Sequence, residues 1–169
     1  MKVSDGGFLG LAAGHSSRFG RCRFAEQFIA SASFLSLTIT KLQKIDFNTH
    51  GTSSTEKNTL KIAQTMGIDT ILMPRASEGM AYSIAFGVEA CQDWQGIILC
   101  LADMPFIETP IYQKILDPVR ARDPQIIRPN NRGKAGHPVY FSHHFFKELR
   151  LLEGDSGAKA IVEKNKLFV

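Results

Sequence analysis

Two short stretches of the sequence combine residue types that could handle a phosphorylated ligand. The first, LAAGHSSRFGRCR, spans residues 11–23 and follows an apolar run. Its backbone amides and hydroxyls can donate hydrogen bonds, and its arginines can neutralise phosphate charge. The second, LADMP over residues 101–105, places Asp103 just past another apolar run. Because Mg²⁺ is usually bound through one or two carboxylates together with substrate phosphates, the two stretches together indicate a site for a metal and a nucleoside triphosphate.

Each stretch also has a purely structural interpretation. A Gly-rich turn after a strand is a common way to reverse the chain, and Asp103 could cap the turn that precedes Pro105. The loop lacks the Lys-Ser/Thr ending of a Walker A loop, and its glycines lack the spacing of a dinucleotide-binding fingerprint. The arginines after the turn are the feature that favours a triphosphate ligand.

The segments around these stretches are predicted to alternate between strands and helices. The strongest strand signal is GIILCLA, residues 96–102, because a continuous apolar run is typical of a strand covered on both faces. GFLGLAA, residues 7–13, is a second predicted strand, and residues 47–51 form a weak one. Further strands are predicted at 69–73, 125–129 and 137–141. Helices are predicted over 24–43, 52–67, 78–91, 109–122, 143–152 and 156–164.

This alternation predicts a three-layer α/β fold with a mainly parallel sheet, built as one domain over residues 1–169. In open sheets of this kind, ligands bind beyond the carboxyl ends of the strands. We therefore expect the Gly-rich loop and Asp103 to face one crevice. In the helix over 78–91, Gly79 and Ser83 are expected near the nucleotide, whereas Met80 and Ile84 are expected in the core.

The composition is that of an ordinary globular protein, with 44% hydrophobic and 21% charged residues and a formal net charge of +4. Because it has no RNA-binding aromatic motif, zinc-finger spacing or basic heptad, nucleic acid is not an expected partner. Cys22, Cys91 and Cys100 are spaced too irregularly for a disulfide framework or a metal site. No run approaches the ~20 apolar residues that cross a bilayer, and the start does not resemble a signal peptide. We therefore expect a cytoplasmic protein with no membrane partner.

Five motifs in order carry a resemblance to a known family. They are LAAGHSSRFGRCR, SEGMAYSIAFGVEA, LADMPFI, GKAGHPVYF and LEGDSGAKAI, which together span most of residues 8–161. The chain resembles the MobA-like nucleotidyltransferases, and its Ala-Ala-Gly and Gly-His-Pro-Val motifs are most similar to the molybdenum cofactor cytidylyltransferase branch. The resemblance implies a Rossmann-like nucleotidyltransferase fold. It also implies Mg²⁺-dependent transfer of a cytidylyl group from CTP to the phosphate of molybdopterin, with release of pyrophosphate.

The resemblance implies roles for residues on the nucleotide side. Arg18 and Arg23 would contact the β- and γ-phosphates, and Asp103 would bind the Mg²⁺ ion. These three residues are the expected catalytic residues. The expected nucleotide contacts are Leu11, Ala12, Ala13, Gly14, Ser16, Arg18, Arg23, Gly79 and Ser83.

On the acceptor side, the resemblance implies that Gly136, His137 and Pro138 face a phosphorylated pterin and that Asp155 makes a second polar contact. His137 could instead be a turn residue held by the backbone, and Asp155 could be a helix cap. The implied protein partner is a molybdoenzyme that receives the finished cofactor.

Some positions depart from the family pattern. The family's lysine falls on Arg23, residues 24–50 lack the usual glycine-proline turn with its helix and long strand, and the chain ends at Val169, before the acidic segment and last helix that relatives usually carry. Two alternatives therefore stay open: a non-catalytic protein that binds a nucleotide or a partner on the same fold, and a GTP-using guanylyltransferase. The oligomeric state is also open.

Overall fold

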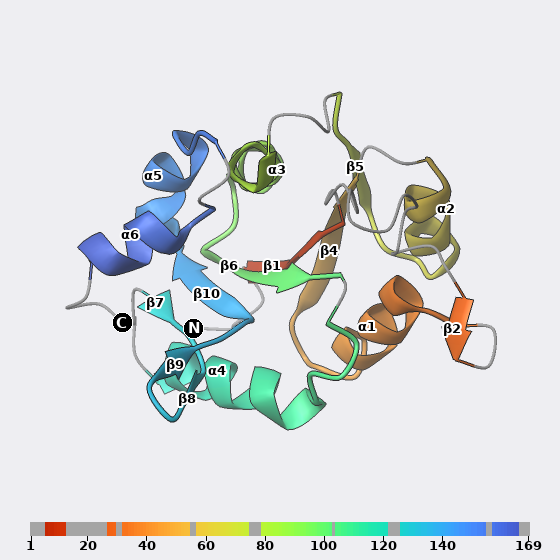
Figure 1. Ribbon diagram of the computed structural model, residues 1–169, viewed down its shortest axis with the longest axis horizontal. Coiled ribbons are helices and arrows are strands. Elements are labelled where there is room, and N and C mark those ends of the chain that lie inside the picture. Colours follow the sequence, from red (N-terminus) through yellow and green to blue (C-terminus); the bar gives the residue numbers. More distant parts are fainter. Residues whose placement is uncertain are drawn as a thin grey trace.

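The computed structural model describes residues 6–12, 27–29, 32–54, 57–74, 79–102, 104–121, 126–154 and 157–165. In this part of the chain a central sheet lies between two layers of helices (Figure 1). The predicted three-layer α/β fold with a mainly parallel sheet is therefore confirmed.

Six described strands form the central sheet in the order β5–β4–β1–β6–β10–β7. Their bounds are β1 (Gly6–Leu11), β4 (Asn48–Ser54), β5 (Thr70–Leu72), β6 (Gly96–Leu101), β7 (Ile126–Ile127) and β10 (Val139–Ser142). The strands from β5 to β6 are parallel, whereas β10 pairs antiparallel with both β6 and β7. Because β1 and β6 stay in register up to the pair Leu11–Leu101, these two strands end level with each other.

The apolar strands send alternate side chains into two separate layers, as the period of a strand requires. On one face, Leu9, Leu11 and Leu99 belong to a core cluster shared with α3 (Gly79–Ala90). On the other face, Phe8 and Ile98 belong to a cluster shared with α4 (Thr109–Ala121). Burial on both faces explains why GIILC in β6 is apolar at every position after its glycine.

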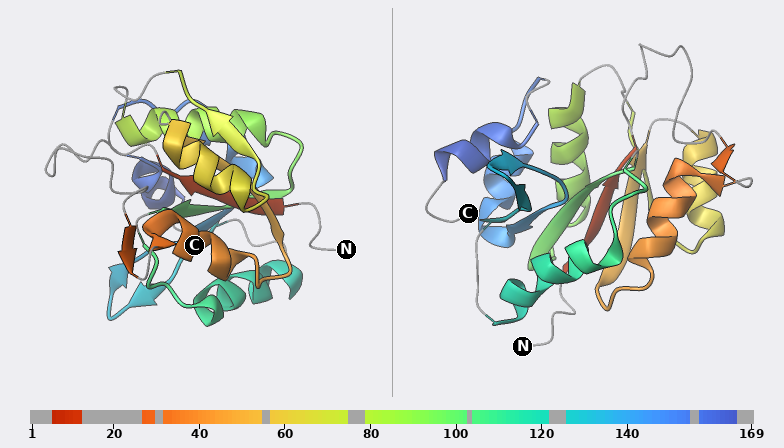
Figure 2. Two further views of the ribbon diagram at one scale, coloured as in Figure 1. Left: turned by 90° about the vertical axis from the view of Figure 1, so that its right-hand side faces the viewer. Right: turned by 60° about the horizontal axis from the view of Figure 1, so that its bottom comes forward.

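The helices divide between the two faces of the sheet (Figures 1 and 2). Helices α3, α5 (Phe146–Arg150) and α6 (Lys159–Lys164) cover one face, together with the short 3₁₀ turn η2 (His143–Phe145). Helices α1 (Phe34–Leu42) and α4 cover the other face, and α2 (Lys57–Thr65) packs beside α1.

Of the described residues in the segment 24–43, which was predicted as a helix, those from Phe34 to Leu42 form the helix α1. Before it, β2 (Gln27–Ile29) and β3 (Ala32–Ser33) form a small antiparallel hairpin, so the prediction is wrong for those residues. The helix begins where it does because the Ser33 hydroxyl accepts a hydrogen bond from the Ser36 amide at 3.1 Å.

The strand β4 is longer than the sequence predicted. Residues 52–54, assigned to the start of a helix, instead continue this strand, and the helix α2 begins at Lys57. The strand carries small polar side chains rather than an apolar run, and Thr52 and Ser54 are both buried. Thr52 lies beneath α1, and the Ser54 hydroxyl donates to the Ala12 carbonyl, so both are buried by distant parts of the chain that a local apolar pattern cannot reveal.

A second hairpin, β8 (Asn130–Asn131) and β9 (Lys134–Ala135), connects β7 to β10. Its turn is closed by a hydrogen bond from the Gly133 amide to the Asn130 side-chain oxygen at 2.8 Å. At its base, the Gly136 amide donates to the Pro129 carbonyl at 3.0 Å. The residues on either side of this base, Arg128 and His137, are therefore held near each other.

Candidate active site

The carboxyl ends of β1 and β6 are joined directly. The Ala102 amide donates a hydrogen bond to the Leu11 carbonyl at 3.2 Å, just beyond the last paired residues of the two strands. The buried Ser54 hydroxyl in turn donates to the Ala12 carbonyl at 3.1 Å. The chain segments that lead into the Gly-rich loop and into Asp103 thus leave the sheet from neighbouring points.

A cavity of about 270 Å³ opens on the α3 face of the sheet at this end. Its walls are mostly apolar and come from β1, β6 and β10 on one side and from α3 and α6 on the other. The lining residues are Leu11, Met80, Ile84, Leu99, Arg128, Ala135, Gly136, His137, Val139, Phe141, Gly157, Ala158, Lys159 and Val162. At this volume the cavity is slightly smaller than typical drug-sized sites, which span about 300–1,000 Å³.

Four of the five sequence motifs meet at this cavity. Leu11 begins the first motif, Met80 lies in the second, His137 lies in the fourth and Gly157 lies in the fifth. The second and fifth motifs are also tied together, because the Ala81 amide donates to the Gly154 carbonyl at 3.2 Å. The remaining motif, LADMPFI, begins at the end of β6 beside Leu11.

The structure brings several predicted site residues together. Leu11, Gly136 and His137 line the same cavity, and Pro138 follows His137 through a cis peptide bond. Gly79 is the first residue of α3, next to Met80 in the lining. Its φ of 84° lies in the left-handed region, which favours glycine, so this residue sets the direction from which the helix enters the site.

Ser83 is more buried than expected for a residue that contacts a nucleotide directly. Its side chain is buried, and its hydroxyl donates to the Gly79 carbonyl at 3.3 Å in the preceding turn of α3. Ala12 is also buried, so the group it can offer a ligand is its backbone.

The other predicted site residues lie outside the described residues. These are Ala13, Gly14, Ser16, Arg18, Arg23, Asp103 and Asp155. Within the described part of the chain, no group of three or more His, Cys, Asp or Glu side chains could hold a metal ion.

The sequence reasoning missed three residues of the cavity wall. Met80 was expected in the core, but it is 44% exposed because it occupies the first turn of α3, where the helix emerges beside Gly157. Arg128 and Lys159 were not singled out, although both line the cavity. A signal for Arg128 was present: it directly follows the short apolar strand β7, and His137 closely precedes β10, which pairs with β7.

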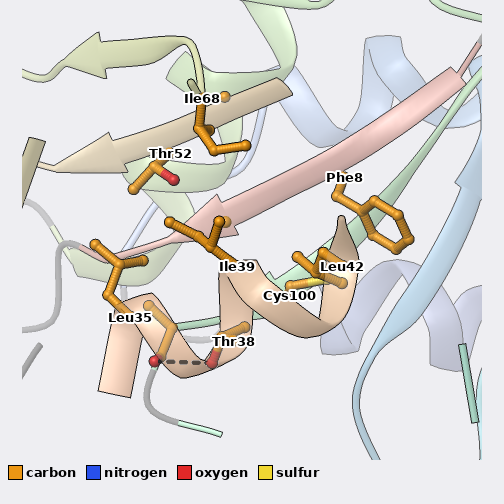
Figure 3. A pocket seen from close by; sticks show the side chains of 11 residues that line it. Phe8, Leu35, Thr38, Ile39, Leu42, Thr52, Ile68 and Cys100 are labelled. Carbon is orange, nitrogen blue, oxygen red and sulfur yellow. Dashed lines mark hydrogen bonds between the residues drawn. The ribbon is translucent and has the colours of Figure 1, made fainter. Parts of the chain in front are cut away.

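A second, much smaller cavity lies on the other face, between α1 and the sheet (Figure 3). Leu35, Ile39 and Leu42 point into it from the helix, facing Phe8 and Thr52 on the strands. Its volume of about 20 Å³ is on the order of one water molecule. Because it cannot admit a substrate, we interpret it as incomplete packing beneath α1.

The described cysteines are free thiols but poor nucleophiles. Burial raises the pKa of Cys91 to about 12. Burial also raises the pKa of Cys100, and a hydrogen bond with Tyr112 opposes this only in part. Because the thiolate is the reactive form, neither residue is suited to covalent catalysis at neutral pH.

The sequence matches the family model of the MobA-like NTP transferase domain over residues 9–167. The chain belongs to this family. No curated protein sequence matches it. The family and the solved structures that resemble the chain support an enzyme of the nucleotidyltransferase kind.

Among the structural neighbours of this MobA-like chain is Rv0371c from Mycobacterium tuberculosis H37Rv, which is 22% identical with a TM-score of 0.80, covering 98% of this chain and 86% of that one. Another structure of Rv0371c contains manganese. A cytidylyltransferase from Leptospira borgpetersenii is 17% identical with a TM-score of 0.74, covering 98% and 74%. Molybdopterin-guanine dinucleotide biosynthesis protein A from Archaeoglobus fulgidus is 12% identical with a TM-score of 0.64, covering 95% and 88%. At these identities the likeness establishes the shared fold.

Among the described residues of this MobA-like chain, no helix has the length and apolar character to span a bilayer.

Proposed function

We propose that this protein transfers a cytidylyl group from CTP to the phosphate of molybdopterin and releases pyrophosphate. The observation that carries the proposal is the cavity at the ends of β1 and β6, where residues expected on the nucleotide side and on the acceptor side line one space. Leu11 and the first turn of α3 belong to the first group, and Gly136 and His137 to the second. A transferase needs two such sites in contact, because its substrates react directly with each other.

On the nucleotide side, the chain leaves β1 at Leu11 and continues into Ala13, Gly14 and the arginine-bearing loop. Backbone groups in this stretch would read the edge of the base, and Arg18 and Arg23 would bind the β- and γ-phosphates. A methyl group at Ala13, where guanylyltransferases of the family usually have glycine, takes up space next to the base. This favours a pyrimidine over a purine by ~1–3 kcal/mol.

The residues that follow β6 suit a divalent metal ion. Asp103 offers a carboxylate, which is the hard oxygen donor that Mg²⁺ prefers, and it follows Ala102, whose position is fixed by the hydrogen bond to Leu11. When bound there, Mg²⁺ would neutralise charge on the triphosphate during transfer. The manganese complex of Rv0371c supports a divalent ion in a related fold.

The acceptor needs little activation by the protein. A phosphate monoester has a second pKa of about 6, so at neutral pH it is mainly a dianion and requires no strong general base. The main obstacle is the repulsion between this anion and the triphosphate. The loop arginines, together with a Mg²⁺ ion held by Asp103, would offset that repulsion and hold the substrates in line.

The test is a transfer assay with purified protein, Mg²⁺ and molybdopterin. CTP, GTP, ATP and UTP are compared by pyrophosphate release and by the mass of the product. We expect the cytidylyl product, with CTP preferred over GTP by tens-fold, and we expect the Ala13→Gly variant to narrow that preference. Preference for GTP would replace the proposal by a guanylyltransferase. Nucleotide binding without pyrophosphate release from any acceptor would indicate a non-catalytic member of the family.

Three further proposals concern the domain organisation, the location and the protein partner of the enzyme. We propose that residues 1–169 form one domain, since the family match runs from residue 9 to residue 167. We propose a cytoplasmic location, which suits the free thiols of Cys91 and Cys100. The expected protein partner is a molybdoenzyme that receives the product.

A further inference from the structure

Arg128 stands out among the residues of the large cavity. It follows β7, its side chain is half-buried, and it lines a wall that is otherwise mainly apolar. Within the described part of the chain, no carboxylate lines the cavity and no hydrogen bond or ion pair involves the Arg128 side chain. A guanidinium group that is partly withdrawn from water into a mainly apolar cavity is stabilised by an anion that replaces its lost hydration.

The other cation of the wall is in a different situation. Lys159 lies at the exposed start of α6, and its ammonium group is 3.7 Å from the Glu163 carboxylate one turn later. Its charge is therefore already shared with a surface partner. Arg128 is the described cation that remains available to a ligand inside the cavity.

The backbone holds Arg128 where it can meet a ligand at His137. The hydrogen bond from the Gly136 amide to the Pro129 carbonyl closes the base of the β8–β9 hairpin between these two residues. β7 is also paired with β10 through Tyr140 and Ile127. The backbone at Arg128 is thus fixed by the sheet and the hairpin together, so only side-chain freedom remains to be lost when it binds an anion.

The size and charge of the cavity point to the acceptor rather than to the nucleotide. About 270 Å³ accommodates one fused ring system, but a whole nucleoside triphosphate needs more space. A nucleobase offers Arg128 hydrogen-bond acceptors but no negative charge to balance the guanidinium, and the triphosphate is assigned to the loop arginines. An anionic group close to Arg128 must then belong to the second substrate.

We propose that this cavity binds the ring system of the acceptor and that Arg128 binds an anionic group attached to that ring system. The planar guanidinium fork suits a phosphate or a carboxylate, which it can bind through two parallel hydrogen bonds. Assigning this ligand to the acceptor rests on the proposed function; the ring-and-anion site itself does not.

The test uses two fluorescent probes that share a bicyclic ring, 1-naphthyl phosphate and uncharged 1-naphthol. Their dissociation constants are measured by fluorescence anisotropy on the full chain and on its Arg128→Gln variant. We expect Arg128→Gln to weaken binding of the phosphate at least tenfold, which corresponds to about 1.4 kcal/mol, and to change binding of the naphthol less than twofold. An unchanged affinity for the phosphate, or an equal loss for both probes, would overturn the proposal.

Two further variants control for charge and for folding. Arg132→Gln removes the same charge from the exposed turn of the neighbouring hairpin, and it is expected to change neither dissociation constant more than twofold. Arg128→Lys keeps the charge without the fork and is expected to fall between wild type and Arg128→Gln. Each melting temperature is compared with that of the wild type. If Arg128→Gln does not fold, Arg128→Lys decides, and unaltered phosphate binding by it counts against the proposal.

Competition and kinetics separate this inference from the proposed function. Saturating CTP with Mg²⁺ should leave the bound 1-naphthyl phosphate in place, whereas displacement would overturn the assignment to the acceptor. In the transfer assay, Arg128→Gln should raise KM for the acceptor at least tenfold and leave KM for CTP within twofold. If the probes bind as expected but molybdopterin accepts no nucleotide, the ring-and-anion site stands and the proposed reaction is wrong.

Discussion

Asp103 follows Ala102, and the amide of Ala102 is held against the end of β1. We expect Asp103→Asn to reduce Mg²⁺-dependent transfer at least a hundredfold, because an amide is a weaker metal ligand than a carboxylate and carries no charge. Initial rates of pyrophosphate release measure the effect. The matched control is Asp93→Asn, which removes an exposed carboxylate from the turn before β6, at the opposite end of that strand. Wild-type activity in Asp103→Asn would remove Asp103 from the metal site.

The loop arginines give a second prediction at the scale of single residues. Arg18→Ala and Arg23→Ala should each weaken binding of CTP by tenfold or more and leave binding of CMP within about threefold. The reason is that both guanidinium groups are assigned to phosphates that CMP lacks, and charge-assisted hydrogen bonds contribute about 1.5–3 kcal/mol each. Isothermal titration calorimetry with the two nucleotides provides the measurement. Equal losses for CTP and CMP would mean that the arginines act elsewhere.

At the scale of elements, the packing on the two faces of β1 leads us to expect opposite changes in stability when two glycines are replaced by alanine. A methyl group on Gly87, in α3, would meet the Leu9 side chain at 2.7 Å, and Leu9 is fully buried. A methyl group on Gly10 would lie 3.4 Å from the Thr52 hydroxyl oxygen and beside the small cavity under α1. The first position is overpacked by a methyl group, whereas the second has room for it.

Gly87→Ala should therefore lower the free energy of unfolding by about 1 kcal/mol or more, although alanine is intrinsically the better helix former. Gly10→Ala should raise it by about 0.4–1 kcal/mol, because the unfolded chain loses freedom and no clash opposes the change. Urea unfolding of both variants measures whether each change in the free energy of unfolding is positive or negative. Stabilisation by Gly87→Ala would show that Leu9 can move aside.

The individual strands also show how much of the fold can be predicted from the sequence. The buried strands β1 and β6 are recognisable locally because both faces need apolar side chains. The strand β4 is not, because its buried side chains Thr52 and Ser54 are polar and are covered by parts of the chain distant in sequence. Similarly, the motif residues Gly136 and His137 were recognisable, whereas Arg128 became a site residue only once the hairpin base brought it beside them.

For the whole molecule, ligand binding should increase the stability of the folded state. A nucleotide that binds only the folded state stabilises it by about 2.7 kcal/mol at one hundred times its Kd. For a chain of this size we expect CTP with Mg²⁺ to raise Tm by roughly 5–10 °C at that concentration. Differential scanning fluorimetry with each nucleotide gives the measurement, with CMP as the comparison. A larger shift with GTP at equal concentration would contradict the assignment of the base.

The wall of the large cavity joins Leu11 near the start of the chain with Val139 and Val162 near its end. During synthesis the first strand leaves the ribosome long before the last helix does. At roughly 5–20 residues per second, the interval between Leu11 and Val162 is on the order of 8–30 s. Throughout that interval the nascent chain has apolar cavity residues with no opposing wall, so substrate capture must wait until Val162 has been synthesised. Ribosome-bound intermediates would therefore be natural clients for a chaperone that recognises exposed apolar strands.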